Sequence, residues 1–436
     1  MAKVVVVGGG ISGLGAAFSL QKAGLDVSVL ESGKEVGGRM RSKFWHDAWI
    51  DLGAEFITDR DTDFDTLARD LGIYDQRVVY PGATVTFEVW RDGKAHPLNF
   101  TYLTSFMKYG GMSFGAKLRL ARMLPVFARQ MMRNQGHKHD PARGAWCDGI
   151  SVEEWLNKVS PEFLEYAVEP AYELYCGYEP HMIGRGFFVY LMTSYPQAGI
   201  FTFKEGLGQL TRTLGSRLNV TTGARVTRVS VGAKPAVVDY EVNGKSERRE
   251  ADMVVVAVQG DRVRNLVSGL DPARQKFFDQ VTYTPHELPF YEVSEAPEGV
   301  PPSLFVPRKE DGVVAALGYE RAATNPEKKF FRVCMKTDYY RKHAHVPDAE
   351  HLQGILNEAA RWYPHVPPLV RDSFVSRWKE GLPVFPAGYC KAVGEFGKLP
   401  PLPGVAFAGD YLTGPSTGAA YASGLRAADQ VLKRLG

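Results

Sequence analysis

A glycine-rich segment near the beginning of the chain has residues whose types and spacing suit phosphate binding. It follows the pattern GxGxxG and includes Gly8, Gly10, Ile11, Ser12 and Gly13. The first glycine permits a tight turn, the second lets a pyrophosphate approach the backbone, and the third lets a helix pack closely on a strand. A helix that begins here would offer free N–H groups and a positive dipole end to phosphate. The pattern therefore predicts a dinucleotide site.

The sequence before and after the glycine-rich segment predicts the strands and the helix that would position this site. Residues 4–7 form a short β-branched run typical of a buried parallel strand, and residues 11–23 have the pattern of a helix. A second strand, residues 27–30, ends in Glu31 and Ser32. A carboxylate there can accept hydrogen bonds from a ribose, and its charge disfavours a 2′-phosphate. The alternative, a strand–turn–helix unit without a ligand, is disfavoured by this spacing.

Two further segments favour a flavin dinucleotide over a nicotinamide one. In a second glycine loop, Gly38 precedes Arg39. A guanidinium suits phosphate because its planar fork donates two hydrogen bonds at once. The second of the two segments contains Gly53, Ala54, Glu55 and Phe56. An extended flavin cofactor needs this additional cation and further close backbone approaches toward its ring, so the sequence predicts FAD.

These segments resemble the flavin-containing amine oxidase superfamily, in particular its protoporphyrinogen oxidase and phytoene-desaturase-like branch rather than the typical monoamine oxidases. The resemblance implies an α/β fold with a discontinuous, Rossmann-type FAD-binding domain of the GR2 type and an inserted α+β substrate domain. We expect the FAD-binding domain to comprise residues 1–80, 205–284 and 386–436. We expect the substrate-binding domain to comprise residues 81–204 and 285–385.

The resemblance extends to the end of the chain. Val226 matches the residue whose backbone meets the adenine in this family. The segment that contains Gly409, Asp410, Gly418 and Ala419 is similar to the C-terminal flavin motif, in which the acid faces the ribityl–phosphate region. In that motif a helix N-terminus points at the pyrimidine end of the flavin, where its dipole favours the reduced cofactor.

The substrate side departs from typical amine oxidases. Leu288 falls where those enzymes carry a lysine that is bridged by water to the flavin, and Pro415 replaces one wall of their aromatic cage. The segment around Trp378 resembles protoporphyrinogen oxidases and desaturases, although Tyr389 replaces their usual histidine. This segment predicts a contact of Trp378 with both cofactor and substrate, or a structural loop and strand beneath the flavin.

Aromatic side chains are dense in the predicted substrate domain and can line a pocket for a flat or long apolar substrate. The candidate pocket residues, each of which could instead belong to the core, are Tyr172, Tyr175, Phe201, Phe203, His286, Leu288, Trp378, Tyr389 and Pro415. No catalytic residue is assigned, because hydride transfer to a cofactor mainly requires orientation and exclusion of water.

We expect an FAD-dependent oxidase or dehydrogenase, desaturase-like in its chemistry, that takes hydride from a C–C bond, or less readily a C–N bond, of an apolar substrate. Oxygen or another acceptor would reoxidise the flavin. One alternative is a flavin amine oxidase with an atypical pocket. A second is an FAD-bound isomerase or a redox-silent FAD scaffold.

The charge balance, the cysteines and the histidines narrow the possible partners, cofactors and cellular setting of the protein. The 52 basic and 49 acidic residues give a net charge of +3, which does not suggest a nucleic-acid-binding protein. The four cysteines lie far apart, and this favours a reducing, cytoplasmic setting. The neighbours of Cys390 do not reproduce a covalent attachment pattern, so we expect non-covalent FAD. His137, His139, His343 and His345 lack companion ligands at metal spacing and are interpreted as solvated, and no metal is expected.

Residues 100–133 combine many apolar side chains with lysine and arginine and contain no acidic residue. Such a pattern predicts either peripheral contact with an anionic membrane surface or helices packed on the core with a solvated basic face. No apolar run approaches the ~20 residues that a membrane span requires. The oligomeric state stays open.

Overall fold

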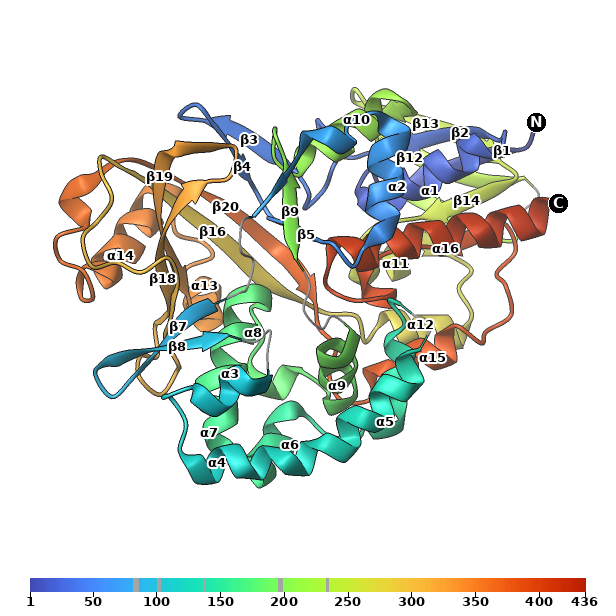
Figure 1. The fold of residues 1–436 in the computed structure, drawn as a ribbon. Helices are drawn as coiled ribbons and strands as arrows, with labels where there is room; N and C mark the ends of the chain where they lie inside the picture. The colour runs from blue at the N-terminus through green and yellow to red at the C-terminus, as the bar shows by residue number, and fades with distance from the viewer. Residues whose placement is uncertain (81–85, 100–102, 136–137, 195–198, 233–234) are drawn as a thin grey trace.

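A parallel five-stranded sheet forms the centre of the half of the molecule that holds both termini (Figure 1). The computed structural model describes residues 1–436 except 81–85, 100–102, 136–137, 195–198 and 233–234. The strand order is β10-β2-β1-β14-β21, with bounds β1 Lys3–Val7, β2 Asp26–Leu30, β10 Asn219–Thr221, β14 Met253–Val256 and β21 Val405–Phe407. The two strands predicted on either side of the glycine segment, β1 and β2, thus lie in one sheet with three strands that are far from them along the chain.

Two helices pack against this sheet and against each other. Helix α1 (Ile11–Lys22) follows the glycine turn, and α16 (Thr417–Leu435) ends the chain. They can approach closely because position 424 is a glycine. A Cβ atom on Gly424 would lie only 2.1 Å from the backbone oxygen of Ser12. Helices α2 (Thr62–Leu71) and α10 (Gly208–Ser216) lie near them (Figure 1).

A larger, mostly antiparallel sheet occupies the opposite half of the molecule. Its order is β20-β16-β19-β18-β17-β7-β8, with bounds β7 Thr86–Arg91, β8 Lys94–Asn99, β16 Tyr283–Val293, β17 Leu304–Phe305, β18 Val314–Ala322, β19 Asn325–Met335 and β20 Val370–Pro383. The long pair β16 and β20 runs from this sheet toward the parallel one (Figure 1). The proposed domain boundaries stay a prediction, although this sheet draws strands from both predicted insertions.

Helices cover the lower side of the molecule in Figure 1. They are α3 Leu103–Lys108, α4 Phe114–Arg119, α5 Leu124–Asn134, α6 Val152–Val159, α7 Pro161–Phe163, α8 Glu169–Cys176 and α9 Arg185–Ser194. Helix α4 begins where the side chain of Ser113 accepts a hydrogen bond from the amide of Ala116. No helix in the described part of the chain is long and apolar enough to cross a membrane.

The remaining elements connect these layers. A four-stranded sheet contains β11 Arg225–Ser230, β12 Ala236–Val242, β13 Lys245–Ala251 and β15 Val267–Ser268, and smaller sheets contain β3 Ser42–Trp45, β4 Ala48–Asp51, β5 Ile57–Thr58, β6 Arg77–Val79 and β9 Ile200–Phe203. The other helices are α11 Gly260–Leu266, α12 Pro272–Phe278, α13 Thr337–Lys342, α14 Asp348–Ala360 and α15 Tyr389–Phe396.

Candidate functional site

A cavity of about 900 Å³ extends from the carboxyl ends of the parallel strands to the large antiparallel sheet. The turns after β1, β2, β14 and β21 contribute Gly8, Glu31, Ala257 and Gly409 to its wall. In open α/β sheets ligands bind outside the carboxyl ends of the strands. The far wall comes from β16, β18, β19 and β20 together with the end of α8.

The glycine turn forms the first wall of the cavity. Gly8 has a φ of +109°, and a Cβ on Gly13 would lie 2.0 Å from the backbone oxygen of Gly8, so helix α1 packs tightly on the turn as predicted. A Cβ on Gly10 would meet no atom within 4 Å, which leaves that backbone open to the cavity. The hydroxyl of Ser12 lines the cavity and is buried without a hydrogen-bond partner. An open backbone and an unsatisfied hydroxyl at a helix N-terminus fit a phosphate.

The carboxylate of Glu31 is fixed beside this turn. It accepts hydrogen bonds from the amide of Gly9 at 2.6 Å and the amide of Gly33 at 2.5 Å. The oxygen bonded to Gly33 also accepts from the Ser32 hydroxyl at 3.4 Å, so the oxygen bonded to Gly9 keeps a lone pair for a ribose hydroxyl. Ser32 also lines the cavity. Val226 does not line the cavity. It lies on β11, further along the chain than the residues whose backbone atoms bond to the backbone of Glu31.

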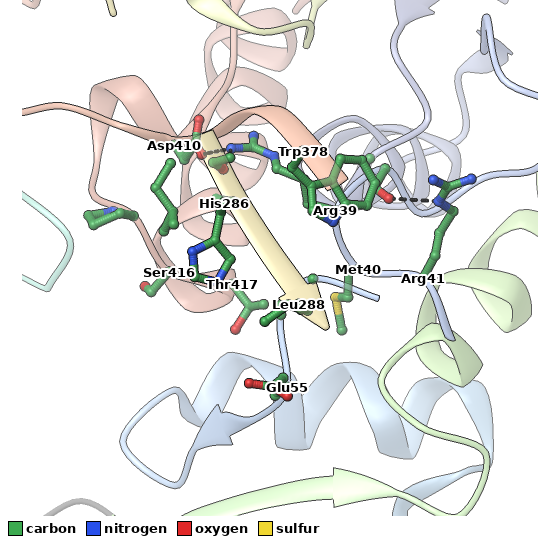
Figure 2. Close-up of a pocket in the computed structure, with 18 of the residues that line it drawn as sticks. Arg39, Met40, Arg41, Glu55, His286, Leu288, Trp378, Asp410, Ser416 and Thr417 are labelled. Atoms are coloured by element: carbon green, nitrogen blue, oxygen red, sulfur yellow. Dashed lines mark hydrogen bonds and ion pairs between the residues drawn. The ribbon is translucent and has the colours of Figure 1, made fainter. Parts of the chain in front are cut away.

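Arg39 and Asp410 form an ion pair at the middle of the cavity (Figure 2). A guanidinium nitrogen of Arg39 lies 2.7 Å from a carboxylate oxygen of Asp410, and it also donates to the backbone oxygen of Gly381. Burial alone would lower the pKa of Arg39, but the Asp410 carboxylate outweighs burial and raises it. The pair therefore holds a permanent cation where the sequence predicted a pyrophosphate contact. Gly38, Gly53, Ala54 and Phe56 line the same cavity.

The beginning of α16 forms another part of the wall. Pro415, Ser416 and Thr417 line the cavity, and the side chain of Ser416 accepts a hydrogen bond from the amide of Ala419. Gly418 and Ala419 themselves lie just behind this wall. A Cβ on Gly418 would lie 2.2 Å from a carboxylate oxygen of Asp61, so the glycine lets the two segments touch.

The interpretation of His139 as a solvated residue is wrong. Its ring is buried, and its Nε2 lies 3.1 Å from a carboxylate oxygen of Asp61, which lines the cavity. His137 lies outside the described residues. In the described part of the chain, no group of three or more His, Cys, Asp or Glu residues could hold a metal ion.

Three charged side chains form a cluster at the antiparallel-sheet end of the cavity, and the sequence analysis missed two of them. Arg332 on β19 lies 2.7 Å from a carboxylate oxygen of Glu55 and 2.7 Å from one of Glu320 on β18. Burial would lower the pKa of Arg332, but both carboxylates raise it well above its ordinary value. The residues could not be paired from sequence, because their proximity depends on the register of β18 and β19.

Predicted pocket residues surround this cluster. His286 and Leu288 on β16 line the cavity together with Tyr175 on α8 (Figure 2 shows the first two). Burial, and secondarily Arg332, lowers the pKa of His286 to about 4, so its imidazole is neutral at physiological pH. Trp378 lines the cavity as well, and its indole N–H donates to the backbone oxygen of Leu52. The Glu55–Arg332–Glu320 cluster therefore brings charged groups into a pocket that the sequence analysis described only as suited to an apolar substrate.

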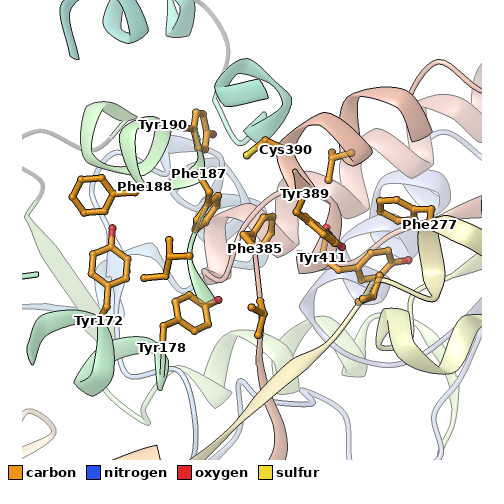
Figure 3. Close-up of a cluster of buried hydrophobic side chains, with 14 of the residues drawn as sticks. Tyr172, Tyr178, Phe187, Phe188, Tyr190, Phe277, Phe385, Tyr389, Cys390 and Tyr411 are labelled. Atoms are coloured by element: carbon orange, nitrogen blue, oxygen red, sulfur yellow. Dashed lines mark hydrogen bonds between the residues drawn. The ribbon is translucent and has the colours of Figure 1, made fainter. Parts of the chain in front are cut away.

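Four other predicted pocket residues lie outside the cavity, in the core. Phe201 and Phe203 are buried on β9. Tyr172 packs against Phe188, with ring centroids 5.7 Å apart (Figure 3). Tyr389 is buried in the same cluster, and its hydroxyl donates to the backbone oxygen of Tyr411. Aromatic density alone does not separate pocket from core, because both bury rings.

The cysteines of the cavity wall were not predicted. Cys176 and Cys334 line its antiparallel-sheet end, and burial raises the pKa of these thiols to about 12 and about 11. Cys390 lies outside the cavity wall, where its amide donates to Asp148. All three thiols are therefore held in the protonated, weakly nucleophilic form, since burial also raises the pKa of Cys390.

The parallel sheet and the phosphate-compatible turns at its strand ends define a nucleotide-binding α/β protein. The family model described as flavin containing amine oxidoreductase matches residues 11–432, and the chain belongs to this family. Membership implies a flavin cofactor and an oxidoreductase. The resemblance inferred from the sequence is confirmed.

Individual relatives agree with this assignment. Putrescine oxidase from Kocuria rosea is 31% identical over 159 residues, which are 36% of this chain and 32% of the relative. The alignments with the first curated relatives cover at most about a third of their length.

Solved structures resemble the whole chain. A putative protoporphyrinogen oxidase from Exiguobacterium sp. 255-15 has a TM-score of 0.75 at 16% identity over 99% of both chains. A putrescine oxidase bound to putrescine has a TM-score of 0.77 at 17% identity, again over 99% of both chains. At these identities the likeness concerns the fold, and the predicted α/β fold class is confirmed.

Proposed function

We propose that this protein is an FAD-dependent oxidoreductase that takes hydride from a C–C or C–N bond of a substrate with an apolar body. The observation that carries the proposal is the continuity of one cavity. It joins the glycine turn and Glu31 at one end to a chamber walled by Tyr175, His286 and Leu288 at the other. A cofactor with a nucleotide end and a reactive ring end would fill both parts.

The residues present fit FAD. The open backbone at Gly10 and the hydroxyl of Ser12 would take the pyrophosphate together with Arg39, and Glu31 would take the adenosine ribose. The beginning of α16 would face the flavin ring. When bound, the flavin would supply the two-electron acceptor. The protein would bind and orient the substrate against it and exclude water.

The thiol chemistry of the wall supports non-covalent attachment of the flavin. Cys176 and Cys334 are the cavity-lining cysteines among the described residues, and their raised pKa values disfavour the thiolate. Acid precipitation of the purified protein should leave the flavin in the supernatant, where chromatography should identify FAD. Flavin that stays in the protein pellet would contradict non-covalent attachment, and recovery of FMN would contradict the dinucleotide.

The substrate chamber supports an apolar molecule with one polar group. Leu174, Leu288 and Leu317 supply apolar wall, while the Glu55–Arg332–Glu320 cluster supplies two carboxylates for one guanidinium. A neutral His286 can accept a proton or a hydrogen bond at the same end. The chamber thus orients the polar group of the substrate at the cluster and its apolar body along the leucines.

Amine oxidation is a second candidate, and the excess carboxylate of the cluster favours it. When both carboxyl groups beside the one guanidinium are ionised, the cluster carries a net negative charge that attracts an ammonium group. Against it, Leu288 supplies no amine where typical amine oxidases carry a lysine. The two candidates therefore differ in the substrate and share the cofactor.

Anaerobic bleaching of the bound flavin distinguishes them. We expect apolar substrates that can be dehydrogenated, such as polyenes, porphyrinogens or steroids, to bleach the flavin and to be recovered as oxidised products. Bleaching by primary or secondary amines alone would establish the second candidate instead. No bleaching by either class, together with full FAD occupancy, would contradict the oxidoreductase proposal. Release of H2O2 on admission of air would identify O2 as the acceptor.

A further inference from the structure

Helices α3, α4 and α5 expose an unusual amount of apolar surface. Among the described residues, six of the twelve exposed large hydrophobic side chains belong to them. These are Met107, Phe114, Leu118, Leu124, Met131 and Met132, each 50% to 68% exposed. Large exposed apolar patches on soluble proteins mark interaction sites.

The opposite side of the same segment packs against the rest of the molecule. Ala116, Met123 and Gln130 recur at seven-residue spacing and are buried against the rest of the molecule. The exposed positions Leu124 and Met131 follow the same period on another side of the helix. The outward side chains are therefore not needed for packing within the chain, and they form a second, separate apolar stripe.

This stripe is accompanied by positive charge and by no acidic residue. Residues 103–134 contain six cations, Lys108, Lys117, Arg119, Arg122, Arg129 and Arg133, and no Asp or Glu. None of the six forms an ion pair with a carboxylate in the described part of the chain. The guanidinium of Arg129 lies over the ring of Trp146 at 4.1 Å, which leaves its charge uncompensated.

The charge decides between two occupants of this face. A second copy of the chain would bring two sets of unpaired cations together, which is electrostatically unfavourable. An anionic bilayer offers phosphates to the cations and acyl chains to the apolar stripe at the same time. The side chains that reach outward are long and flexible, as insertion into a lipid surface requires.

We propose that the outward face of α3–α5, defined by these six apolar side chains and by the exposed Lys108, Arg122, Arg129 and Arg133, docks on an anionic lipid bilayer. Phe114, Leu118, Leu124 and Met131 insert at the headgroup–acyl boundary, and the cations contact lipid phosphates. The protein is thereby held at the surface without crossing it. Helices α4 and α5 lie along the lower and lower right edge of the molecule in Figure 1.

Vesicle flotation of the complete flavin-loaded protein tests the proposal. With vesicles of phosphatidylcholine and phosphatidylglycerol we expect the protein to float with the lipid at low salt, and with phosphatidylcholine alone to remain below. Raising the salt should weaken binding, because part of the attraction is electrostatic. Absence of flotation with the anionic vesicles at low salt would overturn the proposal.

Two pairs of variants locate the binding face. Arg122→Glu removes one cation and adds one anion, so it should weaken partitioning about 30-fold, whereas Lys245→Glu on β13 makes the same charge change elsewhere and should weaken it far less. Phe114→Ser should weaken partitioning roughly 10-fold, while Phe44→Ser, at another exposed phenylalanine on β3, should have little effect.

The control readouts keep the test independent of folding and of catalysis. All four positions are exposed, so flavin content and thermal unfolding should stay unchanged. Equal losses in a test variant and its control would contradict docking through this face. Light scattering that shows a dimer in the parent protein and a monomer in Phe114→Ser would assign the face to a second copy and overturn the lipid proposal.

Discussion

A guanidinium held between two carboxylates makes Arg332 the most sensitive side chain of the substrate chamber. It is 12% exposed and bonds both Glu55 and Glu320 through the same nitrogen. Burial raises the pKa of Glu320 above its ordinary value, and Arg332 opposes this effect only in part. The charge state of this end of the cavity therefore depends on one residue.

Arg332→Met should destabilise the protein by about 3–5 kcal/mol, because it leaves buried carboxylates without a partner. The pKa of Glu320 should then rise further, so the loss should shrink as the pH falls and the carboxyl groups become protonated. Urea unfolding at neutral and acidic pH measures both effects. Arg248→Met, which breaks an exposed pair with Asp239, is the matched control and should have a much smaller effect.

His286 predicts a pH dependence of stability in the flavin-free protein. Its folded pKa of about 4 lies below the ordinary value of 6.5, so between these values the unfolded chain binds the additional proton. Stability should therefore fall as the pH is lowered from about 6.5 to about 4.

The comparison with His286→Asn isolates this contribution. Unfolding free energies measured across the interval should show a shallower pH slope for the variant. His181→Asn, at an exposed position, controls for the removal of any histidine. An unchanged slope in His286→Asn would show that other groups cause the acid sensitivity.

Residue-level prediction from the sequence was uneven for physical reasons. Gly8, Gly10 and Gly13 could be assigned because a phosphate-binding turn constrains backbone conformation within six consecutive positions. Arg332 and Glu320 could not, since each is an ordinary charged residue on a strand until the register brings them together. His139 was misread because its burial depends on Asp61, which is distant in the sequence.

At the scale of elements, the contact between α1 and α16 joins the two ends of the chain. It relies on Gly15, whose added Cβ would lie 2.6 Å from the ring of Tyr421, and on Gly424, whose added Cβ would meet the backbone of Ser12. Both helices also supply residues to the cavity wall. Their spacing therefore sets the width of the phosphate-binding end.

Gly424→Ala should destabilise the protein by about 1–3 kcal/mol and lower its flavin content, because a backbone atom opposite the new methyl group cannot move aside cheaply. Denaturant unfolding and the ratio of flavin to protein absorbance measure the two effects. Gly115→Ala in α4, where the nearest atom is 3.7 Å away, should instead gain about 0.5–1 kcal/mol. A stable, fully flavinated Gly424→Ala protein would contradict the close-packing argument.

Elements with strong local patterns were predictable, and those that depend on distant pairing were not. The strands of the parallel sheet are short, continuous and β-branched, and the helix at the end of the chain has clear periodicity. Strand β14 ends at Val256, and the next residues, Ala257 and Val258, belong to the cavity wall. The pairing of β7 with β17 joins residues more than two hundred positions apart, and no local pattern indicates it.

At the scale of the whole molecule, the cavity wall is assembled from residues 8 to 420, so a flavin can bind only the folded chain. Removal of the flavin should therefore lower the midpoint of thermal unfolding. Added FAD at about 100 times its dissociation constant should restore ~2.7 kcal/mol of stability. Scanning calorimetry measures the shift, and FMN serves as the control. Equal stabilisation by FMN would contradict the role assigned to Glu31 and the glycine turn.

The discontinuous parallel sheet also determines when the protein can acquire its cofactor during synthesis. Strand β1 leaves the ribosome long before its neighbour β14, which follows some 250 residues later, and β21 and α16 emerge later still. Domains that need non-local strand pairing form slowly and expose apolar edges meanwhile. A nascent chain that has already made its glycine turn must therefore wait until residues 405–435 have been translated before the flavin can be enclosed.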